Sequence, residues 1–257
     1  MVKCKHVIAL ALALGTAAMA SESGELSFRA QKSLENGKFA RSYSQLERAL
    51  LASRKEADLL SEARILLSMA HIRTLSLDFA LADSLVSIVR KGALDDQTTA
   101  LYSQVKIALN NAQGKYTEAA KLCNEQNADT LKKASDGVQA TFYSECAIAQ
   151  GALHKAQEAQ EALKMVGKRA DKSSGIYAWT VARIADLNNQ ASADSLYQVA
   201  ETRTIQGNRP HMTATILYYR GLLAEKKNAE LAKDYFLRSK NAFELMGLPN
   251  NAKRSTK

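Results

Sequence analysis

The residue types that usually do chemistry are sparse and widely spaced in this chain. Beyond residue 20 there are three histidines, His71, His154 and His211, and none has a His or Cys three or four residues away. Zinc sites in proteins depend on such spacings, as in the HExxH and CxxC motifs. The sequence therefore predicts no metal site, and we expect the three histidines to be solvated or hydrogen-bonded.

Signatures of nucleophilic or phosphate chemistry are also missing. The chain has no G-x-S-x-G elbow and no phosphate-binding glycine loop. The acidic pair Asp95-Asp96 stands in a predicted turn, where carboxylates favour the start of a helix. We therefore predict a protein that is not an enzyme and holds no cofactor. The alternative is an enzyme of unrecognised type, with a site assembled from distant helices.

The composition indicates which elements must position any site. The 257 residues include 43 Ala and 32 Leu but only 2 Pro, and 46% of the residues are hydrophobic. Ala and Leu lead the helix-propensity scale, whereas Pro is the strongest helix breaker. The chain is also too apolar to be disordered throughout. These numbers predict an all-α globular protein and exclude a β-sandwich.

Residues 1–20 have the features of a secretory signal peptide. Lys3 and Lys5 precede the apolar run 7–14, and Ala18-Met19-Ala20 forms a small-x-small cleavage site before Ser21. The alternative is a short membrane anchor, but the apolar run is shorter than the roughly 20 residues that a bilayer requires. We predict export to the periplasm or cell envelope. We expect no transmembrane segment in the mature chain.

The charge of the mature chain has two interpretations. Net charge is +9 for the whole chain and +7 once the two lysines of the leader are removed. Because an exported protein rarely meets nucleic acid, and because no nucleic-acid-binding motif is present, we exclude that class of partner. A solvated helical surface is the simpler interpretation. Binding to anionic envelope polymer or lipid headgroups is the alternative.

A repeated pattern organises residues 21–250. Small residues recur at intervals of 34 to 40, and each is followed four residues later by an apolar, aromatic or cysteine residue. Residues four apart lie on one face of a helix, so the small residue allows close helix packing and the larger one fills the next gap. One such unit cannot bury its own apolar face, which predicts stacked units. The small residues are Ser42, Ala82, Ala119, Ala159, Ala193 and Ala232, and the larger ones are Leu46, Val86, Cys123, Leu163, Tyr197 and Phe236.

The segment Gly114-Lys115-Tyr116-Thr117-Glu118-Ala119-Ala120 resembles the turn and second-helix start of the tetratricopeptide repeat family. Gly37-Lys38-Phe39 is similar to the same turn, with Ser42 in place of the expected Ala. Leu217-Tyr218-Tyr219-Arg220-Gly221 looks like the family's first-helix core, with Gly221 at its small position. Ala30, Ala70 and Ala147 fill that position in other units, whereas Ile107 and Val181 depart from it. The resemblance implies a binding groove on the concave side.

The predicted fold is all-α, a right-handed α-solenoid of about six antiparallel helical hairpins, followed by a basic, disordered tail at 251–257. First helices are expected at 24–36, 60–75, 97–112, 138–152, 176–189 and 211–226. Second helices are expected at 39–53, 79–91, 116–126, 156–168, 192–206 and 229–246.

Cys123 and Cys146 fall on neighbouring helices of the predicted stack. An exported compartment permits a disulfide between them. The alternative is a pair of buried free thiols that pack as small apolar residues.

Several aromatic residues gather on the later first helices: Tyr143, Tyr177, Trp179, Tyr218 and Tyr219. Trp and Tyr are enriched where a few residues carry most of the binding energy of an interface. We predict Trp179 and Tyr218 as groove contacts, with core packing as the alternative. The function predicted for the whole chain is an exported, non-catalytic scaffold that binds another cell-envelope protein, by a peptide or a partner helix.

Overall fold

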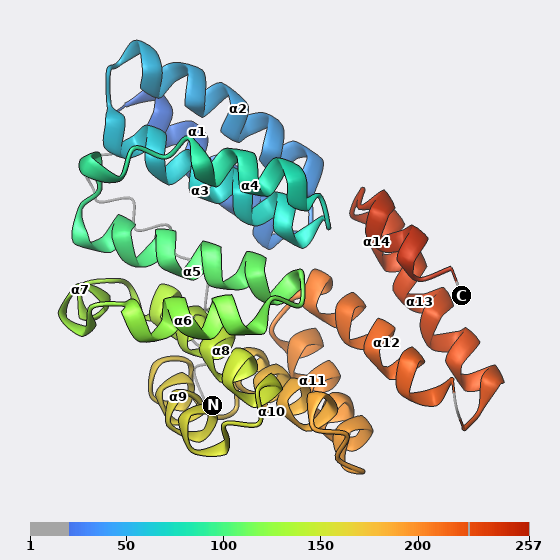
Figure 1. Ribbon diagram of the computed structural model, residues 1–257. Coiled ribbons are helices and arrows are strands. Elements are labelled where there is room, and N and C mark those ends of the chain that lie inside the picture. The colour runs from blue at the N-terminus through green and yellow to red at the C-terminus, as the bar shows by residue number, and fades with distance from the viewer. Residues whose placement is uncertain (1–20, 226, 257) are drawn as a thin grey trace, which may run out of the picture.

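The computed structural model describes residues 21–225 and 227–256, and over these residues the ordered elements are all helical (Figure 1). The leader and its cleavage site lie outside the described residues. The helices are α1 (Glu22–Glu35), α2 (Phe39–Lys55), α3 (Leu59–Leu75), α4 (Phe79–Ser87), the short 3₁₀ turn η2 (Lys91–Ala93), α5 (Asp96–Ala112), α6 (Tyr116–Glu125), α7 (Ala128–Lys132), α8 (Asp136–Ala152), α9 (Ala156–Ala170), α10 (Gly175–Leu187), α11 (Ala193–Gln206), α12 (Pro210–Ala224), α13 (Ala229–Leu245) and α14 (Pro249–Arg254).

The all-α prediction is confirmed, and each of the twelve expected helices has a counterpart. Most ends agree within two residues. The exception is α4, which was expected to reach residue 91 but ends at Ser87. Val89 is buried just beyond that end, and Lys91–Ala93 form a separate 3₁₀ turn. The short helix α7 and the terminal helix α14 were not predicted.

Consecutive helices pack against each other as neighbouring pairs: α1 with α2, α3 with α4, α5 with α6, α8 with α9, α10 with α11, and α12 with α13. Adjacent pairs then contact one another, for example α3 with α5, α5 with α8, and α8 with α10. Hydrogen bonds between pairs join residues 34 apart, including Arg64 to Thr98 and His154 to Asn188. A helical-repeat architecture accounts for this spacing, while its handedness and the number of repeat units stay predictions.

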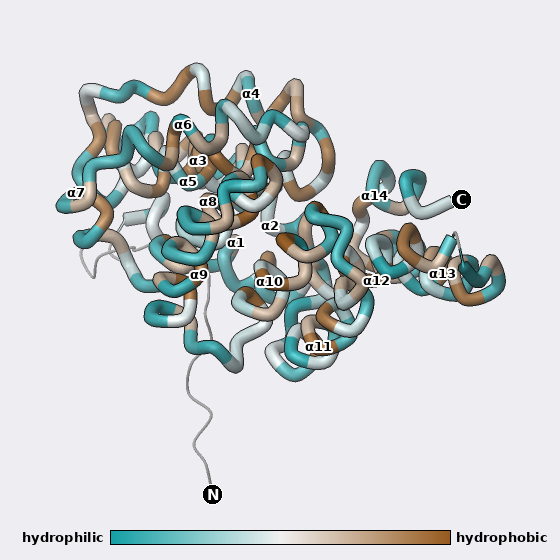
Figure 2. The backbone as a smooth tube through the Cα atoms, turned by 60° about the horizontal axis from the view of Figure 1, so that its bottom comes forward, coloured by the Kyte–Doolittle hydropathy of each residue, from teal (hydrophilic) through white to brown (hydrophobic). Residues whose placement is uncertain are grey.

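The small residues of the pattern lie where paired helices pack most closely. All six of the second-helix positions, Ser42 included, are buried. The Ser42 hydroxyl donates a hydrogen bond to the carbonyl of Ala30 at 2.8 Å, so the serine satisfies its polar group across the pair. Five of the six larger residues one turn later are buried as well, and Cys123 packs partly buried against the same core. In Figure 2, hydrophobic and hydrophilic residues alternate along the helices, as stacked amphipathic helices require.

The described turns between paired helices, those before α2, α4, α6, α9 and α11, share one local structure. At Gly37 and Gly114 the backbone is left-handed, with φ of 71° and 75°. The next N–H donates back to a carbonyl five residues earlier, as Lys115 does to Asn110 at 2.8 Å. This arrangement satisfies carbonyls that a helix end leaves unpaired. Leu77 takes the same conformation without being glycine, at φ 59°.

The two ends of the array lie against each other. The His211 ring, near the start of α12, lies with Nε2 3.1 Å from the carbonyl oxygen of Leu75 at the end of α3. The Asn251 side-chain amide donates to the same carbonyl at 3.0 Å, and Asn250 donates to Ser76 at 3.2 Å. Phe39 of the first helix pair packs on the His211 ring. Figure 1 shows α13 and α14 beside the ends of the N-terminal helices.

The disordered tail predicted at 251–257 is wrong for the residues that the structure describes there. Pro249–Arg254 form α14, and the Asn251 side chain is only 1% exposed. The Ser255 hydroxyl lies 3.1 Å from that of Ser239 on α13. The tail is therefore ordered because its polar side chains find partners on helices that are distant in sequence.

We predict that acid weakens this end-to-end contact. Burial lowers the pKa of His71 and that of His211 from 6.5 to about 4. A histidine whose folded pKa is lowered contributes its full stability above pH 6.5 and loses it as the pH falls towards 4, on the order of 3 kcal/mol for each group. Urea unfolding between pH 7.5 and 4.5 measures this loss. In the double variant His71→Gln/His211→Gln the free energy of unfolding should fall less steeply with decreasing pH. An equal pH dependence in the variant and the wild type would contradict the prediction.

Gly221 provides a test of the packing between α12 and α13. A Cβ atom at this position would lie 2.6 Å from Cε1 of Phe236. We expect Gly221→Ala to destabilise the protein by roughly 1–3 kcal/mol, because a well-packed crossing must move to accept the methyl group. Adding Phe236→Leu should recover part of the loss. Gly92→Ala is the control, since its Cβ would meet nothing within 4 Å; equal effects at both glycines would refute the close approach.

Candidate functional site

Trp179, predicted as a groove contact, lies at the centre of an aromatic group. It stands half-buried on α10, with its ring centroid 6.1 Å from that of Tyr197 on α11 and 5.8 Å from that of Tyr219 on α12. Tyr197 and Tyr219 stack with their planes only 9° apart. Three helices thus supply one rigid set of rings.

Tyr218, the second predicted groove contact, is placed differently. It is only 8% exposed, its ring lies 5.9 Å from that of Phe236, and the Arg254 guanidinium covers it at 4.1 Å. Successive residues of a helix point about 100° apart, so α12 directs Tyr218 toward α13 and α14 and Tyr219 toward Trp179. Tyr218 is therefore buried in the helix packing, the alternative that the sequence left open, and Tyr219 is the partly exposed ring beside Trp179.

Arg183 joins the rings to two polar partners. Its Nη1 donates to Asp186 at 2.5 Å and to the Tyr197 hydroxyl at 3.1 Å, and that hydroxyl donates to Asp186 at 2.8 Å. The guanidinium lies 4.0 Å from the centre of the Tyr219 ring. We call Trp179, Arg183, Asp186, Tyr197 and Tyr219 the Arg183 cluster.

Helix α10 positions this cluster because it presents two different faces. Its alanines Ala178, Ala182 and Ala185 are buried in the helix packing. Trp179, Arg183 and Asp186 follow at intervals of four and three residues, so they share another face. Arg183 is the only basic residue of α10, and an Arg with an Asp three residues later in an otherwise uncharged helix is the sequence signal that could have identified the pair.

The electrostatics of the cluster keep Arg183 charged and Tyr197 neutral. Burial alone lowers the pKa of Arg183, but Tyr219, Tyr197 and Asp186 outweigh it, so the net shift is upward. Burial raises the pKa of Tyr197 well above its usual value. The same cause raises the pKa of Tyr116, whose hydroxyl lies within reach of Arg183. At neutral pH the cluster therefore combines a charged guanidinium with a neutral Tyr197 phenol, both buried beneath the partly exposed rings.

Glu145 adds a carboxyl group on α8, facing the cluster. Its Oε2 accepts a hydrogen bond from Asn111 at 2.8 Å. This bond and the positive charge of Arg183 both act to lower the pKa of the carboxyl group. Burial nevertheless raises the pKa of Glu145. A buried carboxyl with a raised pKa beside a guanidinium is typical of functional sites. Neither Glu145 nor Asn111 was predicted as a site residue.

The structure joins Cys123 of α6 to Cys146 of α8 in a disulfide, with Cα atoms 5.8 Å apart. This pairing was one of the two alternatives that the sequence left open. The bond closes a loop between residues separated by 23 positions. Such a loop stabilises the fold by about 3 kcal/mol in the chain-entropy account. It fixes α6 on α8, the two helices that carry Tyr116 and Glu145.

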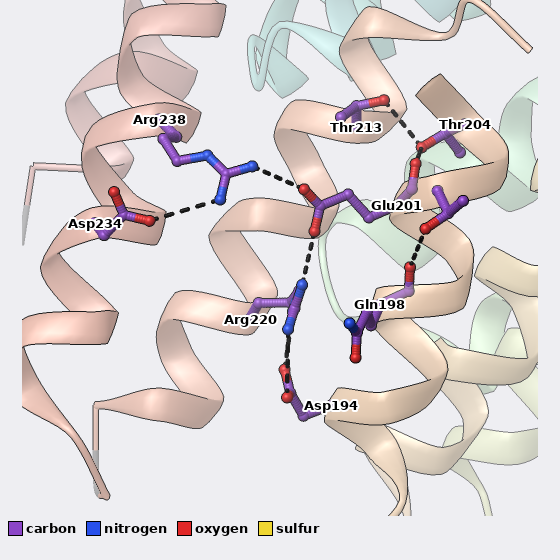
Figure 3. Close-up of polar contacts among 9 residues, drawn as sticks. Asp194, Gln198, Glu201, Thr204, Thr213, Arg220, Asp234 and Arg238 are labelled. Atoms are coloured by element: carbon purple, nitrogen blue, oxygen red, sulfur yellow. Dashed lines mark hydrogen bonds and ion pairs between the residues drawn. The ribbon is translucent and has the colours of Figure 1, made fainter. Parts of the chain in front are cut away.

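A second polar network lies on α11, α12 and α13 (Figure 3). Arg220 donates to Glu201 at 2.7 Å and to Asp194 at 2.9 Å, and Arg238 donates to Glu201 at 2.9 Å. Burial lowers the pKa of Arg220, but the bonds to Asp194 and Glu201 raise it overall. Because each carboxylate of Glu201 and Asp194 is already satisfied by a guanidinium, this network holds the last helix pair in place.

The described residues contain no group of three or more His, Cys, Asp or Glu side chains placed to hold a metal ion. His154 lies in a turn with its Nδ1 2.7 Å from Asn188, and His71 and His211 belong to the end-to-end contact. No helix in the described part of the chain combines the length and apolar character needed to span a bilayer. No protein-family model matches the sequence, and no curated protein is similar to it.

The buried carboxyl of Glu145 predicts a gain in stability on neutralisation. An acid whose folded pKa is raised reduces stability above that pKa, and the penalty disappears as the pH falls below the unfolded value near 4.5. We expect Glu145→Gln, which can still accept from Asn111, to stabilise the protein by on the order of 1 kcal/mol at pH 8 and hardly at all at pH 4. Glu118→Gln, on the exposed face of α6, is the control. A Glu145 variant that is less stable at pH 8 would contradict the assignment.

Proposed function

We propose that the protein is an exported, non-catalytic scaffold of the tetratricopeptide-like type, a right-handed solenoid that binds a peptide or helix of another cell-envelope protein. The Arg183 cluster is the binding surface. The observation that carries the proposal is that the rings of Trp179 and Tyr219 are held by neighbouring rings and by Arg183 and yet remain partly open to solvent. The features of a signal peptide at residues 1–20 support export.

Rigid aromatic residues are suited to binding because little side-chain entropy is lost when a partner covers them. Trp179 is held by two tyrosine rings, and Tyr219 by stacking on Tyr197 and by the guanidinium of Arg183. A partner therefore meets a preformed surface. Trp, Tyr and Arg are also the residue types enriched among binding hot spots.

The charges of the cluster indicate which ligand it favours. Arg183 is already neutralised by Asp186, so an anionic ligand would compete with an internal carboxylate. The exposed part of the cluster is aromatic, formed by the rings of Trp179 and Tyr219. A peptide that presents an apolar or aromatic side chain to these rings satisfies this feature.

The decisive experiment places a photoreactive phenylalanine analogue at Tyr219 in intact envelopes and identifies the crosslinked protein. The affinity of the purified partner is then measured for the wild type, for Trp179→Ala and for Phe28→Ala. We expect Trp179→Ala to weaken binding at least tenfold, as removal of a hot-spot residue does. Phe28, a partly exposed aromatic on α1, should have no effect.

Salt dependence completes this test. Binding to the aromatic surface should change less than threefold between 50 and 500 mM salt, because apolar contacts are not screened. A partner whose affinity survives Trp179→Ala, or collapses with salt, would overturn the proposal.

A further inference from the structure

The outward face of α2 carries a straight basic stripe. Arg41, Ser44, Arg48, Leu51 and Lys55 follow one another at intervals of three and four residues, and all five are exposed. Residues at these intervals form one line along a helix, here about 21 Å long. We call these five residues the α2 stripe. Figure 1 shows α2 at the outer edge of the N-terminal helices.

The cations of the stripe have no partners within the described residues. No hydrogen bond or ion pair involves the side chains of Arg41, Arg48 or Lys55 there, and what distinguishes these three cations is their alignment on one helix face. Glu47, the only acid of α2, is exposed at the edge of the stripe, three residues from Ser44 and four from Leu51, so the stripe carries three cations and one flanking carboxylate. The opposite face of α2 is buried on α1 and α3, so the stripe sits on a fixed support.

Leu51 is the one apolar side chain of the stripe. Its side chain is 60% exposed, between Arg48 and Lys55. A leucine held outward among unpaired cations is unfavourable in water and favourable where a polar, anionic layer covers an apolar one. The interface of a lipid bilayer has that order.

We propose that the α2 stripe docks the protein on an anionic membrane surface, with the cations among the phosphate headgroups and Leu51 directed toward the acyl chains. A partner helix fits the stripe less well. It would remove three charges from water and bury a single leucine in return, and desolvation of charges usually outweighs so small an apolar gain. Headgroups keep the cations hydrated, and a straight line of charges matches a flat surface.

This inference is independent of the proposed function. The stripe belongs to α2, and the Arg183 cluster to α10, α11 and α12, so no residue is shared. A protein docked through α2 keeps the cluster free, and either proposal can fail without the other.

Co-sedimentation of the mature chain with vesicles tests the proposal. We use vesicles of phosphatidylcholine with 30% phosphatidylglycerol, and phosphatidylcholine alone, at 25 and 300 mM salt. Binding should require the anionic lipid and weaken at high salt, since the attraction is screened. Each Lys or Arg near such a surface contributes about fivefold. The triple variant Arg41→Gln/Arg48→Gln/Lys55→Gln should therefore bind roughly a hundredfold more weakly.

A matched control separates the stripe from net charge. Lys155→Gln/Lys164→Gln/Lys168→Gln removes three exposed cations at the start of α9 and along it, none of them ion-paired within the described part of the chain, and should reduce binding less than threefold. All variants replace exposed side chains, and circular dichroism confirms their folding. Equal losses in the two triple variants would overturn the proposal, because binding would then follow total charge.

Leu51 distinguishes a membrane from another polyanion. Leu51→Ser should weaken vesicle binding about fivefold or more, since an inserted leucine loses its apolar burial. It should not change binding to double-stranded DNA, which offers phosphates but no apolar layer. Tight DNA binding with vesicle binding unaffected by Leu51→Ser would reject the lipid surface in favour of a nucleic-acid phosphate site.

Discussion

The close approach of paired helices at small residues is the constraint on which the rest of this structure depends. Ser42 shows how strict it is, since its hydroxyl is accommodated only by donating to the Ala30 carbonyl across the pair. Close pairing leaves each pair with an apolar face on both sides, which the next pair covers. The terminal pairs lack one neighbour. In this chain the last helices instead lie on the first two pairs: Phe39 of α2 packs on His211, and the Leu75 carbonyl at the end of α3 meets His211 and Asn251.

Local and periodic information was enough to predict the helices but not the contact between the ends. The small residues, the turn glycines and the helix starts are signals within a few residues of one another, so their positions could be found from the sequence. The end-to-end contact joins residues 136 to 176 apart. Asn251 illustrates the difference: in Pro249–Arg254 it resembles part of a frayed polar tail, and only the distant Leu75 carbonyl makes its burial favourable.

The candidate site was predicted in part for the same reason. Trp179 could be found because a single tryptophan on a first helix is conspicuous in a chain with one Trp. The choice between Tyr218 and Tyr219 depends on how α12 is rotated against its neighbours, and adjacent positions in a sequence do not fix that rotation. Arg183 carried a usable signal, since a charge flanked by the apolar residues Ala182 and Ile184 must find a partner or leave the core.

Two buried arginines show how the structure divides stability from recognition. Arg220 is held by the carboxylates of both Asp194 and Glu201, and Arg238 satisfies the remaining oxygen of Glu201, so this network is closed. Arg183 has one carboxylate partner and meets aromatic rings on its other sides. Its second acidic neighbour, Glu145, instead accepts a hydrogen bond from Asn111, and burial raises the pKa of the Glu145 carboxyl. A closed network stabilises a helix pair, whereas an open one retains polar groups and ring faces that a ligand can use. This difference is why we place the binding surface at Arg183 and not at Arg220.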